Sequence, residues 1–159
     1  MVYKEFLSLL NIDISCITNI NDIPFLPIQF FKSHKVVSSK KKAAQIFLSS
    51  GTTGLTQSKH FVTDISMYEE SFTKGFEHFY GSIKNYTVLA LLPSYLERGG
   101  SSLVYMANDM IAQSKQAESG FYLHDLEALK NTLLKLEAKG KKTLLIGVSY
   151  ALLDLIEAH

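Results

Sequence analysis

Short, nearly continuous hydrophobic runs alternate along this chain with longer segments in which hydrophobic residues recur every three or four positions. The runs at 46–48, 86–92 and 143–148 have the length and composition of buried strands. Residues 59–63 have the pattern of a second short strand that returns from the turn after 48. Helical periodicity predicts helices over 3–10, 66–79, 102–116, 126–139 and 150–158.

Polar residues and glycines mark where these helices begin and end. The predicted N-caps are Asp64 or Ser66, Ser101 or Ser102, Asp125 and Ser149, and the predicted stops are Gly81 and Gly140. The periodicity also predicts the buried faces, which are Phe72, Phe76 and Phe79 in 66–79, Leu126, Leu129, Leu133, Leu134 and Leu136 in 126–139, and Leu152, Leu153 and Ile156 in 150–158.

The order of these elements predicts the fold class. Strand and helix alternate from Ile46 onward, which favours a three-layer α/β domain with a largely parallel sheet and helices on both faces. We expect one domain over 1–159, with residues 1–43 as an N-terminal arm that Phe30 and Phe31 anchor to the core. Ligands of such sheets bind beyond the carboxyl ends of the strands. We expect three loops to gather at that edge: 49–54, 93–100 and 147–150.

The loop after the first strand has the chemistry of a polyphosphate site. Gly51 and Gly54 allow positive φ angles and close backbone approach, and successive N–H groups in such a loop can bind an anion. Neither glycine is followed by Lys-Ser or Lys-Thr, so the loop is not a Walker A motif. An ordinary surface loop is the alternative. The predicted phosphate-binding residues are Ser49, Ser50, Gly51, Thr52, Thr53, Gly54, Lys59 and His60.

The string Ser49-Ser50-Gly51-Thr52-Thr53-Gly54 resembles the phosphate-binding loop of the adenylate-forming superfamily, which includes the acyl-CoA synthetases. Most members continue with an apolar residue, Pro and Lys, whereas Leu55-Thr56-Gln57 follows here. In this departure the chain resembles the acyl-protein synthetases of the bacterial luciferase fatty-acid reductase complex. Residues 23–32 and 91–106 also resemble this branch. The resemblance covers most of the chain but only the early part of such an enzyme.

The resemblance implies a partial N-terminal domain of an acyl-activating enzyme. In the whole enzyme, a fatty-acid carboxylate attacks the α-phosphate of ATP with Mg²⁺ present, and the acyl group then passes from the acyl-adenylate to a thiol. The superfamily's adenine, ribose and Mg²⁺ motifs and its mobile Lys are absent from this chain, so we expect it to be inactive alone. A nucleotide-binding or interaction module without chemistry is one alternative, and a structural fragment with a vestigial loop is another.

The resemblance also implies an acyl pocket formed by two strand-end loops. Its residues would be Tyr95, Gly99, Gly100 and Gly147. Leu96 stands where many members have His, so no histidine role is carried over. Without the resemblance, 93–100 is a glycine-containing turn and 147–150 is a strand-to-helix turn with a serine cap.

Composition narrows the function classes. Hydrophobic residues make up 47% of the 159 positions and the net charge is +1, which argues against a nucleic-acid or membrane surface. No run reaches the roughly 18 apolar residues of a membrane span, and no secretory signal is visible, so we expect a cytoplasmic protein. The five histidines share no metal-ligand spacing, so we predict no protein-bound metal site. Cys16 is expected to be a small buried hydrophobe rather than a nucleophile.

The continuous apolar runs also bear on partners. Such runs are typical of strands that are covered on both faces of a sheet. If the chain stops at 159, later strands and helices of the parent domain are missing, and we expect exposed apolar surface and an open sheet edge. We therefore expect a homo-oligomer or a complementing polypeptide, in addition to ATP and a fatty acid in the parent enzyme.

Overall fold

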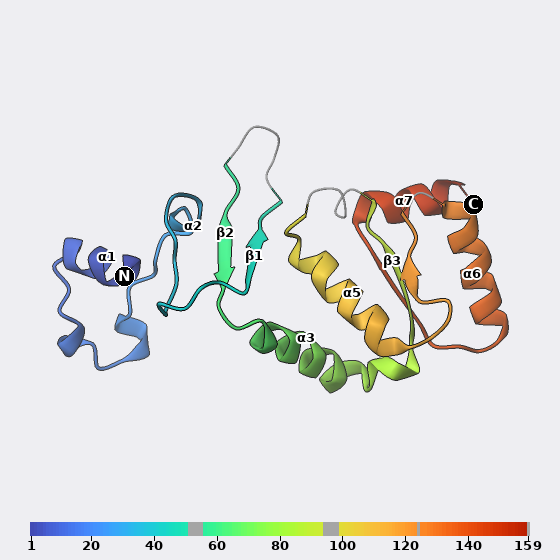
Figure 1. Ribbon diagram of the computed structural model, residues 1–159, viewed down its shortest axis with the longest axis horizontal. Helices are drawn as coiled ribbons and strands as arrows, with labels where there is room; N and C mark the ends of the chain where they lie inside the picture. The colour runs from blue at the N-terminus through green and yellow to red at the C-terminus, as the bar shows by residue number, and fades with distance from the viewer. Residues whose placement is uncertain (51–55, 94–98, 124, 159) are drawn as a thin grey trace. The chain divides into compact units, whose positions relative to one another are not determined.

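The computed structural model describes residues 1–50, 56–93, 99–123 and 125–158. The chain divides into two compact units, Met1–Ile65 and Ser66–His159 (Figure 1). The expectation that they form one domain stays a prediction. Among the described residues, no helix has the length and hydropathy needed to span a membrane.

The first unit ends in a β-hairpin. Its elements are α1 (Val2–Leu9), the 3-10 turns η1 (Ile14–Cys16) and η2 (Ile20–Asp22), α2 (Phe30–Ser33), β1 (Gln45–Leu48) and β2 (Lys59–Val62). Strands β1 and β2 are antiparallel, with Leu48 opposite Lys59 next to the loop. The predicted returning strand is therefore confirmed. The expectation that β1 joins the parallel sheet is wrong for the described strands, because β1 pairs there only with β2.

Aromatic contacts hold the N-terminal arm together and join it to the hairpin. The Phe6 and Phe30 rings meet edge to face, with centroids 5.5 Å apart, and the Tyr3 hydroxyl donates to the Pro24 carbonyl at 2.7 Å. Phe31 stacks on the ring of His60 in β2. Cys16 is exposed and not buried as expected, because it lies in the short η1 turn, which has no buried residue.

The second unit contains a three-stranded parallel sheet in the order β4–β3–β5. Its elements are α3 (Ile65–Tyr80), η3 (Ile83–Asn85), β3 (Thr87–Leu91), α5 (Ser102–Ser114), β4 (Gly120–Phe121), α6 (Leu126–Ala138), β5 (Thr143–Gly147) and α7 (Ser149–Ala158). Every residue of β3 is buried, as its nearly continuous apolar run predicts.

Helices cover both faces of this sheet (Figure 1). On one face, Val88 packs with Met110 of α5 and with Phe72 and Phe76 of α3. The opposite face packs Leu89 and Leu91 against α6 and α7. The predicted mixed α/β class, with a parallel sheet between helical layers, is therefore confirmed for this unit.

Helix ends follow the predicted chemistry. Ser101 Oγ accepts a hydrogen bond from the Val104 N–H at 3.3 Å, and Asp125 Oδ1 accepts one from the Ala128 N–H at 2.8 Å. Gly81 lies at φ 76°, a left-handed conformation that glycine adopts without strain. Ser149 is the first residue of α7 and does not precede the helix as a cap.

Three predicted buried faces are partly wrong. Phe79, Leu134, Leu153 and Ile156 are exposed, and Leu153 and Ile156 leave 57% and 72% of their surface in solvent. The reason is clearest in α7, where Ala151, Leu152 and Leu155 face the core. This helix is apolar on most of its circumference, so its periodicity does not select a single face.

Candidate functional site

The base of the predicted phosphate loop is closed by three hydrogen bonds between its two ends. The Ser49 N–H donates to the Ser58 carbonyl at 3.0 Å, and the Ser58 N–H donates to Ser49 Oγ at 2.9 Å. Gln57 Nε2 also donates to the Ser49 carbonyl at 3.0 Å. Ser58 is only 7% exposed, so its own N–H is largely shielded from water. Ser49 therefore holds the ends of the loop together.

The loop itself falls mostly outside the described residues. Ser50 is described and exposed, whereas Gly51, Thr52, Thr53 and Gly54 are not among the described positions. Their predicted contacts with phosphate stay predictions.

The two predicted cations point to opposite faces of β2, because successive side chains alternate along a strand. The His60 ring stacks on Phe31, with centroids 4.7 Å apart and planes 20° apart. Lys59 is exposed and shares its face with Phe61, two residues further on. Lys59 and His60 therefore cannot approach one phosphate from the same side of the hairpin.

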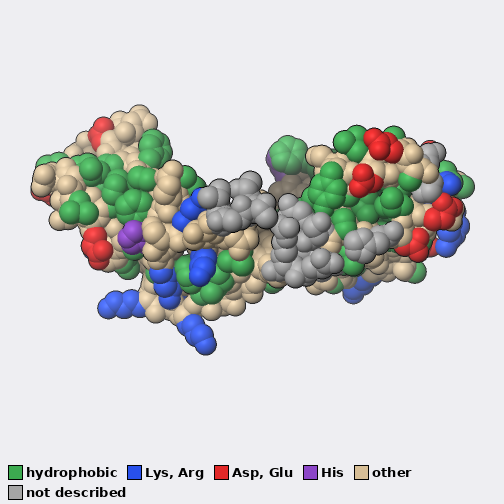
Figure 2. All heavy atoms as spheres, turned by 90° about the horizontal axis from the view of Figure 1, so that it is seen from above, with side chains coloured by type: hydrophobic (Ala, Val, Ile, Leu, Met, Phe, Trp, Pro, Cys, Tyr) green, Lys and Arg blue, Asp and Glu red, His purple; other side chains and the backbone are tan. Residues whose placement is uncertain are grey.

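Lys35 adds a second cation to the face of Lys59. Its ammonium lies 5.3 Å from the centroid of the Phe61 ring, within range of a cation–π contact. Figure 2 shows several Lys side chains (blue) in the part of the surface that carries the hairpin. The hairpin thus carries Lys59 on the side that Lys35 of the arm approaches and the His60–Phe31 stack on the other.

A second candidate site lies at the carboxyl edge of the parallel sheet. The chain passes from β3 to β4 on one side and later to β5 on the other, so the strand order reverses at β3. Ligands of open parallel sheets bind at such a switch point. A cavity of about 130 Å³ lies there, and its lining residues are Leu91, Pro93, Leu123, Leu126, Ala151 and Asp154. Asp154 is the one charged residue of this lining among the residues that the structure describes.

The predicted acyl-pocket residues that the structure describes, Gly99, Gly100 and Gly147, are not in this lining. Tyr95 lies outside the described residues, and Gly99 and Gly100 adopt φ angles of 59° and 70°. A Cβ at Gly147 would lie 2.6 Å from Leu152 Cδ2 of α7. The small size of Gly147 therefore serves the packing of α7 against the end of β5, and its assignment to an acyl pocket stays a prediction.

No family model, curated protein or solved structure matches this chain. The resemblance to adenylate-forming enzymes therefore depends on the quoted residues alone.

The structure adds two groups that sequence reasoning missed, Lys35 and the Gln57–Ser58 pair. The position of Gln57 and Ser58 just before β2 is a signal that could have identified them as the second end of the loop. No local signal identifies Lys35, which comes from the arm. In the described part of the chain, no group of three or more His, Cys, Asp or Glu side chains is placed to hold a metal ion.

Proposed function

We propose that this chain is the N-terminal part of an ATP-dependent, cytoplasmic acyl-activating enzyme, and that residues 49–60 form its polyphosphate-binding loop. The observation that carries the proposal is the closed hairpin base, in which Ser49 bonds to Ser58 and Gln57. This base brings the ends of a hydroxyl- and glycine-rich segment together, and Lys59 and Lys35 share one face beside it.

In this proposal, the chain's own residues position the nucleotide. Backbone N–H groups and hydroxyls of the loop bind phosphate oxygens, and Lys59 offsets their negative charge. A fatty-acid carboxylate oxygen forms a bond to the α-phosphorus of ATP while the bond to pyrophosphate breaks. The loop would stabilise charge on the leaving pyrophosphate, which is an electrostatic and positioning role. Mg²⁺ would be present with ATP, as the resemblance implies.

The second candidate is a nucleotide-binding or interaction module without catalysis. It is favoured by the separate hairpin sheet, in which β1 pairs with β2 alone among the described strands. Such a module needs the phosphate loop but no acyl site.

Pyrophosphate release separates the two candidates. We expect no release from this chain with ATP and a fatty acid, because the superfamily's later motifs are absent. Addition of a polypeptide that carries those motifs should restore release in the first case and not in the second. Lys59→Ala should weaken Mg²⁺-ATP binding, whereas Lys41→Ala, a change of an exposed Lys before β1, should leave it unchanged. Equal binding by wild type and Lys59→Ala would remove Lys59 from the site.

A further inference from the structure

Charge is unevenly distributed between the two units. Residues 1–65 contain seven Lys and four acidic residues, whereas residues 66–159 contain nine Lys or Arg and eleven acidic residues. Between Asp22 and Asp64 there is no Asp or Glu, and this acid-free segment carries six of the lysines. The net charge of +1 for the whole chain therefore hides a basic first unit and an acidic second unit.

All lysines of the acid-free segment are exposed. Three of them stand in succession directly before β1, and the full set is Lys32, Lys35, Lys40, Lys41, Lys42 and Lys59. Among the described residues, none of the six forms an ion pair with a carboxylate. Their charges are therefore not offset by neighbouring acids and attract an anionic surface.

Large hydrophobic side chains are exposed on the same unit. Phe25 leaves 95% of its surface in solvent, and Ile20 and Ile28 are also exposed. The segment of Phe25 and Ile28 leads into α2, and the hydrogen bond from the Tyr3 hydroxyl to the Pro24 carbonyl holds its start against α1. These side chains thus lie on a part of the unit that is fixed by contacts and yet leaves them uncovered.

The two kinds of side chain share a face of the first unit. Figure 2 shows hydrophobic side chains (green) and Lys side chains (blue) there, next to each other. A flat lipid surface can contact both at once, since apolar side chains enter the boundary between headgroups and acyl chains while ammonium groups attract anionic headgroups. Lys is depleted in protein interfaces, and aliphatic side chains offer no ring on which a base could stack. The combination therefore favours a bilayer over an acidic protein or a nucleic acid.

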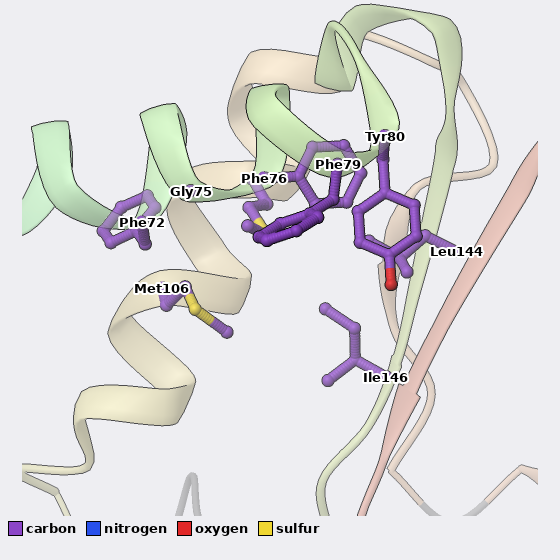
Figure 3. A pocket seen from close by; sticks show the side chains of 9 residues that line it. Phe72, Gly75, Phe76, Phe79, Tyr80, Met106, Leu144 and Ile146 are labelled. Carbon is purple, nitrogen blue, oxygen red and sulfur yellow. The ribbon is translucent and has the colours of Figure 1, made fainter.

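The second unit has an apolar surface without this basic charge. A groove of about 430 Å³ lies between α3, α5 and β5, and Figure 3 shows Phe79 and Ile146 among the side chains that line it. All residues of α3 and α5 are described, and they include four acidic residues and one Lys. Anionic headgroups would be repelled there, so this groove offers a control for the effect of apolar exposure alone.

We propose that the first unit docks on the surface of a bilayer that contains anionic lipid. The lysines of the acid-free segment supply the electrostatic attraction, and Phe25 and Ile28 supply shallow apolar insertion. Binding of this kind is peripheral and needs no helix that crosses the bilayer. This inference goes beyond the proposed function and does not depend on nucleotide binding.

Co-sedimentation of the full chain with vesicles tests the proposal. The vesicles consist of phosphatidylcholine alone or of phosphatidylcholine with phosphatidylserine. We expect wild type to bind the anionic vesicles at least about tenfold more tightly, and to lose this preference as salt screens the charges. Lys40→Gln/Lys41→Gln/Lys42→Gln should weaken binding about a hundredfold, at about fivefold for each Lys. Phe25→Ser should weaken it at least about tenfold.

Matched variants of the second unit are the controls. Lys84→Gln/Lys139→Gln/Lys141→Gln removes the same charge from three exposed positions, and Phe79→Ser removes an exposed ring at the groove. Both should bind anionic vesicles like wild type. Replacement of residues 40–42 by Arg keeps the charge and should also preserve binding. Unchanged far-ultraviolet spectra and melting temperatures would show that the variants of the first unit stay folded.

Several results would overturn the proposal. They are no binding of wild type to either vesicle, equal binding to both, a Phe25→Ser protein that binds like wild type, and a loss in the control triple variant as large as that at residues 40–42. Glycerophosphoserine at the same headgroup concentration should not displace the vesicles, and displacement would show a site for a soluble phosphate instead. Binding to a single-stranded oligonucleotide without binding to vesicles would assign the lysines to nucleic acid.

Discussion

The Ser49→Ala variant tests whether the hairpin base holds the phosphate loop closed. In the structure, Ser49 Oγ accepts the Ser58 N–H at 2.9 Å, and Ser58 is almost fully buried. Removal of the hydroxyl leaves this buried N–H without its acceptor. A buried donor that loses its partner costs about 1–3 kcal/mol. Opening of the hairpin should therefore become about 5- to 150-fold more frequent.

Amide hydrogen exchange measures this opening directly. The Ser58 amide and the paired amides of β1 and β2 should lose protection in Ser49→Ala by that factor, whereas amides of β3 should keep theirs. Ser50→Ala is the matched control, because Ser50 is exposed and next in sequence. If Ser49→Ala and Ser50→Ala exchange at the same rate, the bond to Ser58 does not stabilise the hairpin and this reasoning is refuted.

Two further predictions concern the second unit. Gly147→Ala should lower the free energy of unfolding by about 1–3 kcal/mol, because its Cβ would overlap Leu152, and Leu152→Ala in the same chain should relieve part of this loss in thermal melts. The hydrogen bond from Lys135 holds the pKa of Glu118 below its ordinary value of 4.5, so this pair stabilises the fold above that pH and the contribution is lost as the pH falls. Lys135→Met should therefore be less stable at neutral pH and lose less stability on acidification, and parallel acid unfolding curves for both proteins would contradict this.

The residue types within single segments predicted many elements of the second unit. The run around β3 is apolar at every position except Thr87, and such a run identifies a strand that is buried on both faces. Ser101 and Asp125 precede helical periodicity and have the side chains of N-caps. Strand β4 was missed because it contains two residues, too few for any period to be seen.

Contacts between residues far apart in the sequence explain the remaining differences between the predicted and the observed structure. The run at β1 resembles a central parallel strand, but its partner is set by the turn that follows and by β2, not by its own residues. The contact of Lys35 with Phe61 joins the arm to the hairpin and has no sequence signature. Leu153 and Ile156 follow the helical period, yet only the packing of α7 on the sheet decides that they face solvent.

Calorimetric titration of Mg²⁺-ATP into the wild-type chain and into Gly51→Val/Gly54→Val tests the central claim most directly. Valine side chains at these positions should block approach of the backbone to phosphate. We expect a wild-type Kd no tighter than the high micromolar range, since each missing 1.4 kcal/mol of adenine and ribose contact costs about tenfold in affinity. The variant should bind at least about tenfold more weakly, while its far-ultraviolet spectrum stays unchanged. An equal response of the two proteins to ATP would contradict the assignment of residues 49–60 as a polyphosphate-binding loop.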